Sequence, residues 1–495
     1  MDPRLRTALV ALAASLAAVM LGWQVAEGAY AWPALAAVTI VAAVLVRLIG
    51  LPFDTIFTGF LLIGYIVGNR GFAQLMPVPN LPLLPAEIGL ALATACLLVR
   101  CAFERRLPFR KDALNWAVLA WLAVGSVRVP FDVPRHGFLA LRDYALVYYA
   151  VFFFLVQHMA REAAARRYLI GCLLAALLAL GPVYALFRGF ESFFVTQLTF
   201  AGAPLIYFKG DIAATYLVIG ALLIHHWAQG RQRLWAWPVA AGLFLSVMAS
   251  DSRAAQLGAL VAVVLLLLAR RWRFPALHGG VTALALVVVV ALAVFFDNTW
   301  ARRKLHGVAD RLQSVVDVTG TRTYTSEESF FKGDNNRYRL IWWKNVVEAT
   351  WQENPAFGLG FGADLAHDFV QEYYPDLTED FGIRSPHNVF ITIFGRLGFV
   401  GLAVWGMFCA CVVGATWRAL HRSDRPPDWA LWCAVCVILC SATFGVVLEG
   451  PMGAVVFWTL LGLAGSPSGP EAAAADVVAE GETARDGDAG AEQRA

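Results

Sequence analysis

The sequence predicts an all-α, polytopic transmembrane protein with about 12–14 membrane helices and one large hydrophilic segment outside the membrane. Of its 495 residues, 59% are hydrophobic and only 15% are charged, whereas a soluble domain has about 25% charged residues. Apolar runs of about 18 residues or more, the length that crosses about 30 Å of hydrocarbon, recur along the chain. These runs are continuous rather than alternating, which excludes a transmembrane β-barrel.

The apolar runs define the predicted helices in order. The first run is interpreted as a membrane helix rather than a cleaved signal peptide, because it lacks a small-residue cleavage site and a second run follows almost at once. The last run contains "EGPMG" at 449–453, where glycine and proline predict a break into two halves. The predicted spans are 6–25, 30–49, 53–69, 83–101, 113–128, 139–160, 167–187, 211–228, 234–250, 253–270, 277–297, 387–417 and 429–464.

The chain divides into four parts, and the basic residues predict their orientation. The parts are N-terminal helices (1–297), a hydrophilic segment (298–386), C-terminal helices (387–465) and an Ala-, Gly- and acid-rich tail (466–495). That tail has no apolar periodicity and is predicted to be disordered. With the N-terminus inside, the inside loops carry nineteen Lys and Arg residues against seven in the short outside segments. The positive-inside rule therefore predicts cytoplasmic termini and an outside location for 298–386.

Uncommon polar side chains gather at the outside face of this predicted topology. They are Arg142, Lys209, Asp211, Arg253, Arg337, Arg339, His387 and Asn388. Charged groups at the edge of membrane helices are costly, so they tend to be paired or functional. Each also has a structural interpretation, because a basic side chain can snorkel to the interface and a Ser, Asp or Asn can cap a helix. Their convergence on one face favours a functional site.

The chemistry that suits this set is phosphate binding. Guanidinium groups bind phosphate or pyrophosphate oxygens bidentately and stay charged. A neutral histidine beside them can accept a proton from a hydroxyl, because its ordinary pKa is about 6.5 and nearby cations lower it. Arginines can also stabilise a departing pyrophosphate without a metal. Neither a metal nor a cofactor is therefore expected.

Other unusual residues in the sequence receive mainly structural interpretations. The Gly-rich "GLGFG" at 358–362 is interpreted as a turn, because it is too short for a dinucleotide fingerprint. Helical spacing favours packing for the cysteine triplet of the last span. The aromatic side chains of the hydrophilic segment suit either packing or stacking on sugars. The residues in question are Cys433, Cys436, Cys440, Trp342, Trp343, Trp351, Tyr373 and Tyr374.

Three motifs in order resemble the O-antigen ligase and O-antigen polymerase superfamily. They are "SDSRAAQLGALV" (250–261), "NNRYRLIWWKNVVEATWQENPAFGLGFG" (335–362) and "SPHNVFITIFGRLGFVGL" (385–402). The family pattern is a Ser-Arg at a helix start, an Arg shortly before Trp, a Pro-x-x-Gly-x-Gly turn, and a His-Asn opening a helix with Gly-x-x-Gly. The similar core covers about 209–402.

The resemblance implies a metal-independent, inverting glycosyltransferase of the bacterial inner membrane. Such an enzyme moves a glycan from undecaprenyl pyrophosphate to an acceptor hydroxyl at the periplasmic face. His387 would be catalytic, while Arg253 and either Arg337 or Arg339 would bind the pyrophosphate. Arg142 is added only by its predicted position.

The resemblance leaves the roles of some residues and the acceptor open. Lys209, Asp211 and Asn388 are candidate donor or acceptor contacts, although "FKGDIAATY" (208–216) departs from the Asn-containing start of that helix in many relatives. The acceptor would be lipid A core for a ligase, another lipid-linked repeat for a polymerase, or a protein hydroxyl for an O-oligosaccharyltransferase. Because no appended domain suggests protein recognition, a surface polysaccharide (O-antigen or exopolysaccharide) is favoured. A transporter or flippase of lipid-linked oligosaccharide is the alternative of another class, and the absence of an internal repeat disfavours it.

Overall fold

The computed structural model describes most of the chain between residues 44 and 466. The described residues are 20, 40, 44–76, 83–104, 109–200, 202–296, 298–299, 301–303, 305–307, 327–374, 383–422 and 426–466. The chain divides into two compact units, Met1–Phe60 and Leu61–Ala495. The predicted spans 6–25 and 30–49 lie largely outside the described residues, and so does the predicted tail after residue 466.

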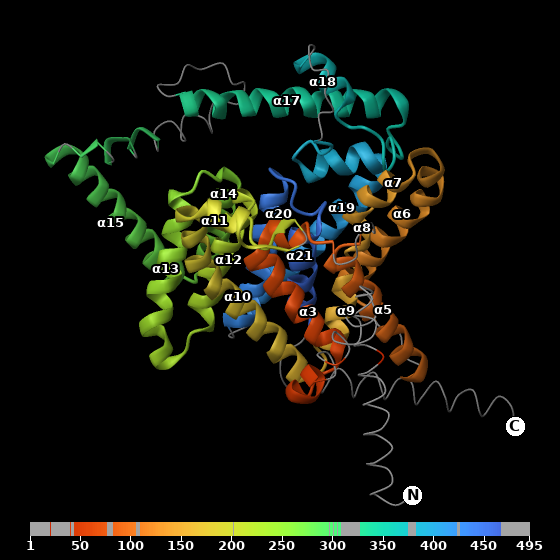
Figure 1. Ribbon diagram of the computed structural model, residues 1–495, viewed down its shortest axis with the longest axis horizontal. Helices are drawn as coiled ribbons and strands as arrows, with labels where there is room; N and C mark the ends of the chain where they lie inside the picture. The colour runs from red at the N-terminus through yellow and green to blue at the C-terminus, as the bar shows by residue number, and fades with distance from the viewer. Residues whose placement is uncertain are drawn as a thin grey trace, which may run out of the picture. The chain divides into compact units, whose positions relative to one another are not determined.

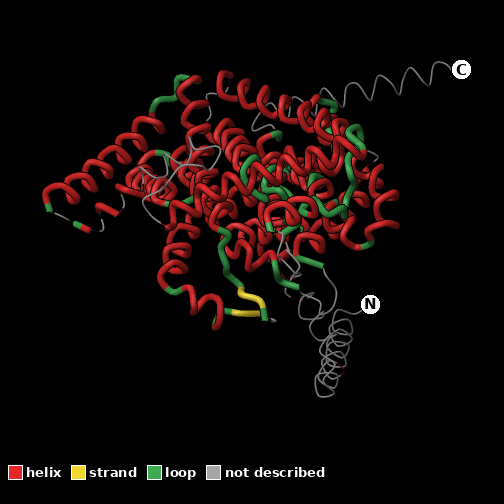
Figure 2. The backbone as a smooth tube through the Cα atoms, turned by 90° about the horizontal axis from the view of Figure 1, so that it is seen from above, coloured by secondary structure: helices red, strands yellow, loops and turns green. Residues whose placement is uncertain are grey.

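The all-α class is confirmed. Helix makes up about 80% of the structure, and the only sheet among the described residues is a hairpin of two two-residue strands, β1 (Thr199–Phe200) and β2 (Ala203–Pro204). Figure 2 shows this hairpin beside the helices.

Six helices in the described part of the chain are long and apolar enough to cross a membrane. They are Phe53–Ala73 (α3 Phe53–Ile63, η1 Gly64–Gly68 and α4 Asn69–Ala73), α5 (Pro85–Glu104), α6 (Ala113–His136), α10 (Ala163–Gly189), α15 (Arg273–Phe295) and α19 (Val389–Arg422). A seventh span arises if Phe138–Tyr148 and Val151–Met159, bent by 42°, are one broken helix. A multi-pass membrane protein is thus confirmed, and the count of about 12–14 helices stays a prediction.

The remaining elements are shorter, and several fill out the predicted spans. They are α7 (Phe138–Asp143), α8 (Ala145–Tyr148), α9 (Val151–Met159), α11 (Glu191–Thr196), α12 (Gly210–Trp227), η2 (Gly230–Gln232), α13 (Arg233–Ala249), α14 (Arg253–Leu268), α20 (Pro426–Ala442) and α21 (Pro451–Ala464). The break expected near 449–453 is confirmed, because the chain is non-helical between α20 and α21. Pro451 then occupies the first turn of α21, where its missing N–H costs no helical hydrogen bond.

Helix α12 is the central helix of the second unit. It packs against α10, α13, α14 and α20, and nearly all of its side chains from Ile212 to His225 are buried. A helix that is apolar all round is stable only when neighbours cover every face. The short connections at 228–232 and 250–252 make α12, α13 and α14 antiparallel, so alternate ends of these helices meet.

The hydrophilic segment contributes two helices, α17 (Glu327–Glu353) and α18 (His367–Tyr373). Figure 1 shows α17 running across one end of the membrane helices of this unit, with α18 beside it. The two helices share a small hydrophobic core that includes Trp342, Leu365 and Phe369. Helix α17 stops at Glu353, directly before Asn354-Pro355, because the residue before a proline disfavours the helical conformation.

Candidate active site

A pocket of about 820 Å³ lies where several helix ends meet. Its walls come from the end of α10, the start of α12, the end of α13, the start of α14 and one face of α17. These elements are distant in sequence, and the antiparallel order of α12, α13 and α14 brings their ends together. The polar lining includes Arg188, Asp211, Ser252, Arg253, Asn336 and Arg339.

Of the two candidate arginines on α17, only Arg339 lies on the helix face that lines the pocket. Asn336, Arg339, Leu340 and Trp343 line the pocket, and this i, i+3, i+4, i+7 spacing places them on one side of a helix. Arg337 is exposed and does not belong to that lining. Two residues along a helix correspond to about 200° of rotation, so Arg337 and Arg339 point away from each other.

Arg253 reaches the pocket from the first turn of α14. Ser252 caps this helix, since its hydroxyl accepts a hydrogen bond of 3.3 Å from the backbone N–H of Ala255. The structural interpretation of the "SDSR" turn as a helix cap is therefore correct. The cap fixes the start of α14, and Arg253 is the first residue of that helix. Burial, and then the charge of Arg253, lower the pKa of Arg339, whereas Asp211 opposes this effect. The two guanidinium groups and the carboxylate therefore share one electrostatic environment.

His387 lies beside the pocket in an unusual backbone conformation. Its φ of 58° is in the left-handed region, which non-glycine residues occupy rarely and mostly at constrained sites. The indole of Trp343, which lines the pocket, donates a 2.7 Å hydrogen bond to the carbonyl of Pro386, and the ring of Trp342 lies 5.9 Å from the imidazole. The pocket wall thus holds the histidine loop directly.

The imidazole of His387 is held neutral and retains an unused nitrogen. Burial, followed by the charges of Arg339 and Lys209, lowers its pKa to about 4, although Asp211 and a backbone hydrogen bond at Ser385 act in the opposite direction. Its Nδ1 atom is buried, and it has no hydrogen-bond partner among the described residues. This nitrogen can accept a proton or a hydrogen bond from a bound molecule.

Lys209 and Asp211 form an ion pair of 3.5 Å at the start of α12. Lys209 also donates a hydrogen bond of 3.0 Å to the carbonyl of Val446, so it ties α12 to the segment between α20 and α21. Asp211 lines the pocket. The pair therefore supplies one fixed carboxylate among the pocket arginines.

Two other predicted site residues, Arg142 and Asn388, do not line the pocket. Arg142 is exposed on α7, outside the lining of the pocket. Asn388 caps α19, because its side-chain oxygen accepts hydrogen bonds of 2.9 Å and 3.3 Å from the backbone N–H groups of Phe390 and Ile391. The structural interpretation of Asn388 as a helix cap is thus correct.

The two glycine motifs of the sequence bind each other through the backbone. Leu359 and Gly360 donate hydrogen bonds of 2.7 Å and 3.2 Å to the carbonyls of Gly395 and Arg396. A side chain on Gly358 would lie 2.6 Å from the backbone of Arg396, so only glycine permits this approach. Gly358, Gly360 and Gly362 all have positive φ, and the interpretation of "GLGFG" as a turn is confirmed.

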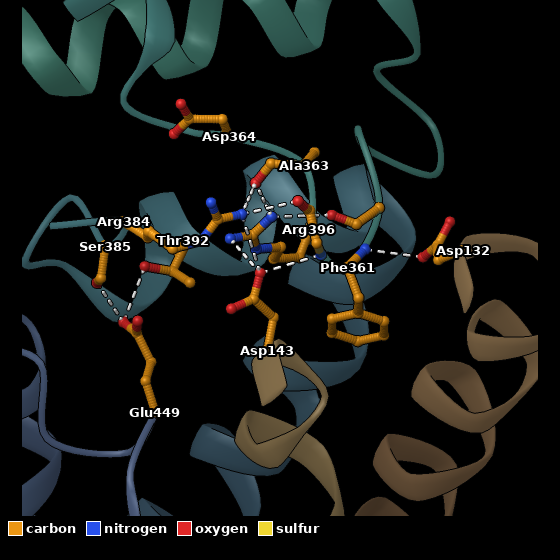
Figure 3. Close-up of polar contacts among 12 residues, drawn as sticks. Asp132, Asp143, Phe361, Ala363, Asp364, Arg384, Ser385, Thr392, Arg396 and Glu449 are labelled. Atoms are coloured by element: carbon orange, nitrogen blue, oxygen red, sulfur yellow. Dashed lines mark hydrogen bonds and ion pairs between the residues drawn. The ribbon is translucent and has the colours of Figure 1, made fainter. Parts of the chain in front are cut away.

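Buried charges clamp the glycine turn to the membrane helices (Figure 3). Arg396 forms a 2.7 Å ion pair with Asp143 and donates hydrogen bonds to the carbonyls of Gly360 and Ala363. Asp143 also accepts a 3.0 Å hydrogen bond from the backbone N–H of Gly362. Because a buried guanidinium is costly unless its donors are satisfied, this cluster fixes the turn strongly.

Glu449 holds the loop that carries His387. Its Oε1 atom accepts hydrogen bonds of 2.8 Å from Ser385 and 3.0 Å from Thr392, one on each side of the histidine. Figure 3 shows both hydroxyls pointing at this carboxylate. Glu449 was not predicted as a site residue, although its position at the expected break of the last span was a signal.

Arg188 is a second residue that the sequence did not single out. It is exposed at the end of α10 and lines the pocket. Its only sequence signal was an outside position after a long apolar run. With Arg253 and Arg339, it gives the pocket three guanidinium groups from three helices.

The aromatic residues and cysteines mostly have packing roles. Trp342 is fully buried and its indole donates a hydrogen bond to the carbonyl of Leu365, so it packs rather than stacking on a ligand. All eight cysteines are free. In the part of the chain that the structure describes, no three His, Cys, Asp or Glu side chains are arranged to hold a metal ion.

The fold and the pocket define a multi-pass membrane protein whose site is cationic and lies at the ends of its helices. Residues 238–406 match the family model described as O-antigen ligase, which confirms the resemblance to the O-antigen ligase superfamily and indicates a glycosyltransferase-type membrane ligase. The matched range contains Arg253, Arg339 and His387. No curated protein matches the chain.

Proposed function

We propose that the protein transfers a glycan from undecaprenyl pyrophosphate to an acceptor hydroxyl at the periplasmic face of the bacterial inner membrane. One observation carries the proposal: Arg253 and Arg339, from helices far apart in sequence, line one pocket beside the loop of His387. The match to the O-antigen ligase family supports this class of reaction.

The pyrophosphate of the donor would lie between the pocket arginines. Guanidinium groups bind phosphate oxygens through paired N–H groups and keep their charge at any physiological pH. Arg188, Arg253 and Arg339 approach from three directions, and the apolar lining includes Leu257, Leu340 and Phe444. Charged and apolar walls in one cavity at a helix-bundle end suit a molecule that is both a phosphate ester and a lipid.

The transfer would be a direct displacement at the anomeric carbon. The acceptor oxygen forms a bond to this carbon while the bond to the pyrophosphate oxygen breaks, and the electron pair leaves with the pyrophosphate. The hydroxyl proton passes to a nitrogen of His387, and the arginines stabilise the developing negative charge. The configuration at the anomeric carbon is inverted, and undecaprenyl pyrophosphate is released.

The position of the pocket supports an enzyme over a transporter. Transporters place their substrates near the bilayer midplane, often at broken helices of repeated halves. Here the pocket lies at the ends of α12, α13 and α14 and under α17. Glycan ligation and glycan polymerisation both fit this arrangement, and transfer to a protein hydroxyl is the third option.

A substitution that preserves the backbone tests the role of His387. Asn tolerates the left-handed conformation better than Ala does, so His387→Asn should fold normally while losing about 10²–10⁴-fold in transfer rate. Donor binding and thermal stability in detergent serve as controls. Glycan transfer by His387→Asn at the normal rate would show that this residue is not catalytic.

A matched pair on α17 tests the pyrophosphate site. Arg339→Ala should weaken binding of undecaprenyl-pyrophosphate glycan by at least about tenfold, because a charge-assisted pair to phosphate is lost. Arg337→Ala removes the same charge from the other side of the same helix and should bind the donor almost normally. Equal losses in both variants would contradict the assignment.

A deletion strain distinguishes the acceptors. If all attached polymer is missing from the surface lipopolysaccharide, the enzyme is a ligase, and if single repeat units stay attached, it is a polymerase. Normal surface glycan together with an under-glycosylated protein would indicate an O-oligosaccharyltransferase.

A further inference from the structure

A second set of basic residues lies at the opposite ends of the helices that form the pocket. Helix α12 begins at the pocket and ends at Trp227, and its 18 residues span about 27 Å at 1.5 Å per residue. This length is close to the hydrocarbon thickness of a bilayer, about 30 Å. At this far end lies a group that we term the arginine–histidine cluster, which comprises His225, His226, Arg233, Arg271, Arg273 and His278.

Two arginines of the cluster are fixed on aromatic rings. The guanidinium of Arg233 lies 5.7 Å from the ring centre of Trp237 and donates a hydrogen bond of 3.4 Å to the carbonyl of Ala228. That of Arg271 lies 5.6 Å from the ring of Trp429 and donates to the carbonyl of Leu420. A planar guanidinium held in this way loses little further freedom when it binds an anion.

The histidines form the floor of the cluster. His225 stacks on Trp237 at 5.0 Å and lies 5.1 Å from His278, whereas His226 lies 4.4 Å from Trp429. His225 Nδ1, His226 Nε2 and His278 Nε2 are buried and have no hydrogen-bond partner among the described residues. Arg233 and Arg273 both act electrostatically on His225. Each of these ring nitrogens can donate or accept a hydrogen bond, so the base of the cluster can interact with a polar group that binds there.

The surroundings of the cluster have the composition of a membrane interface. Leu234, Trp235 and Trp272 follow or flank its arginines in sequence and are 80%, 51% and 62% exposed. Tryptophan with an exposed face beside arginine is typical of the headgroup level of a bilayer. Within the described residues, neither Arg233 nor Arg273 forms an ion pair with a carboxylate.

We propose that the arginine–histidine cluster binds the headgroup of an anionic phospholipid in the leaflet opposite the pocket. The phosphate would accept from Arg233 and Arg273, and the glycerol and upper acyl chain would lie along Trp235 and Trp272. Basic pockets between membrane helices recognise anionic headgroups in this way. The site does not depend on the proposed enzymatic function, because it lies at the other end of the helices.

Thermal unfolding of the purified full chain in detergent tests the site. The probes are phosphatidylglycerol, phosphatidylcholine and inorganic phosphate, each in titration. A lipid that binds only the folded protein raises the unfolding temperature, and the stabilisation grows with the logarithm of the ratio of lipid concentration to Kd. Phosphatidylglycerol should stabilise the wild type, whereas phosphatidylcholine and inorganic phosphate should not.

A matched variant pair makes the test specific. Arg233→Gln with Arg273→Gln should weaken the apparent affinity for phosphatidylglycerol roughly 30-fold, because each basic residue contributes about 1 kcal/mol and 1.4 kcal/mol is a factor of ten. The control is Arg161→Gln with Arg167→Gln, two exposed arginines near the start of α10, which lies at the same end of the bundle. This control should keep the wild-type affinity.

Several outcomes would overturn the proposal. If the control pair lost as much affinity as the cluster pair, phosphatidylglycerol would act through surface charge alone, and that result would count against a defined site. An unchanged response in the cluster variant, no response in the wild type, or equal stabilisation by phosphatidylcholine or inorganic phosphate counts against it as well.

Discussion

His387 illustrates how one residue combines backbone strain with an unusual proton affinity. Its backbone is in the left-handed conformation and its imidazole lies 5.9 Å from the ring of Trp342, while Asn388 caps the helix that follows. Such conformations persist only where surrounding contacts over-determine them. Here the contacts are the indole of Trp343 at Pro386 and the carboxylate of Glu449 at Ser385.

The lowered pKa of His387 predicts an unusual pH profile. The neutral imidazole is the form that accepts a proton, and with a pKa of about 4 it stays neutral well below the ordinary value of about 6.5. Transfer should therefore be nearly constant from about pH 5 to pH 8 and should fall as the pH drops through about 4. Initial rates in detergent across this range measure it, and half-loss of activity near pH 6.5 would contradict the prediction.

Glu449 should act as a positioning residue for His387. Glu449→Gln keeps an oxygen that accepts from Ser385 and Thr392, so most activity should survive. Glu449→Leu orphans both hydroxyls, each costing about 1–3 kcal/mol when buried, and should lower kcat about 10–100-fold with little change in KM for the donor. Equal losses in both variants would indicate that the charge, rather than hydrogen bonding, matters.

At the scale of elements, the two glycine motifs act as one structural unit. Pro-x-x-Gly-x-Gly forms a turn after α17, Gly-x-x-Gly interrupts α19 at Gly398, and their backbones are joined by hydrogen bonds. Phe399 and Val400 also donate to the carbonyls of Pro355 and Ala356. Neither motif belongs to the lining of the pocket; their backbone hydrogen bonds hold the end of α17 against α19.

Gly398 provides a test of this unit. Its φ is 60°, and a Cβ atom there would lie 2.5 Å from the carbonyl carbon of Ala356. Gly398→Ala should therefore cost about 2–4 kcal/mol of stability through strain and overlap and should weaken donor binding. Gly406→Ala in the same helix, where nothing lies within 4 Å, should change the unfolding temperature little. Similar unfolding temperatures for the two variants would contradict this account.

At the scale of the whole second unit, the proposed catalytic pocket and the proposed lipid site lie at opposite ends of the same helices. The pocket and the arginine–histidine cluster lie at opposite ends of α12, α13 and α14. Antiparallel helices of bilayer length sort their connecting loops into two planes, one for each membrane surface. A catalytic surface and a lipid-binding surface can therefore use the same helices.

The proposed orientation predicts which plane faces the periplasm. In a variant without the eight native cysteines, Trp351→Cys on α17 should react with a membrane-impermeant maleimide in intact spheroplasts. Arg231→Cys, in the loop between α12 and α13, should react only after permeabilisation. Both side chains are exposed, so access to solvent does not bias the comparison. The reverse labelling pattern would refute the orientation.

The sequence by itself determined the all-α membrane class of the protein, and it predicted many of the helices and two candidate residues of the pocket region. Hydrophobic runs and helix caps depend on neighbouring residues only, so they can be predicted locally. Arg253 and His387 could be proposed as candidates because each lies at a predicted helix start within a motif. The break between α20 and α21 followed from Gly and Pro for the same reason.

Only the tertiary structure decided which side chains share the pocket. The choice of Arg339 over Arg337 depends on the rotation of α17 about its axis, which its contacts with α18 and α19 set. Arg188 lines the pocket and Glu449 holds the His387 loop only because segments far apart in sequence pack together. Such contacts leave no periodic signal in the chain, because they depend on how whole helices pack and not on their local residues.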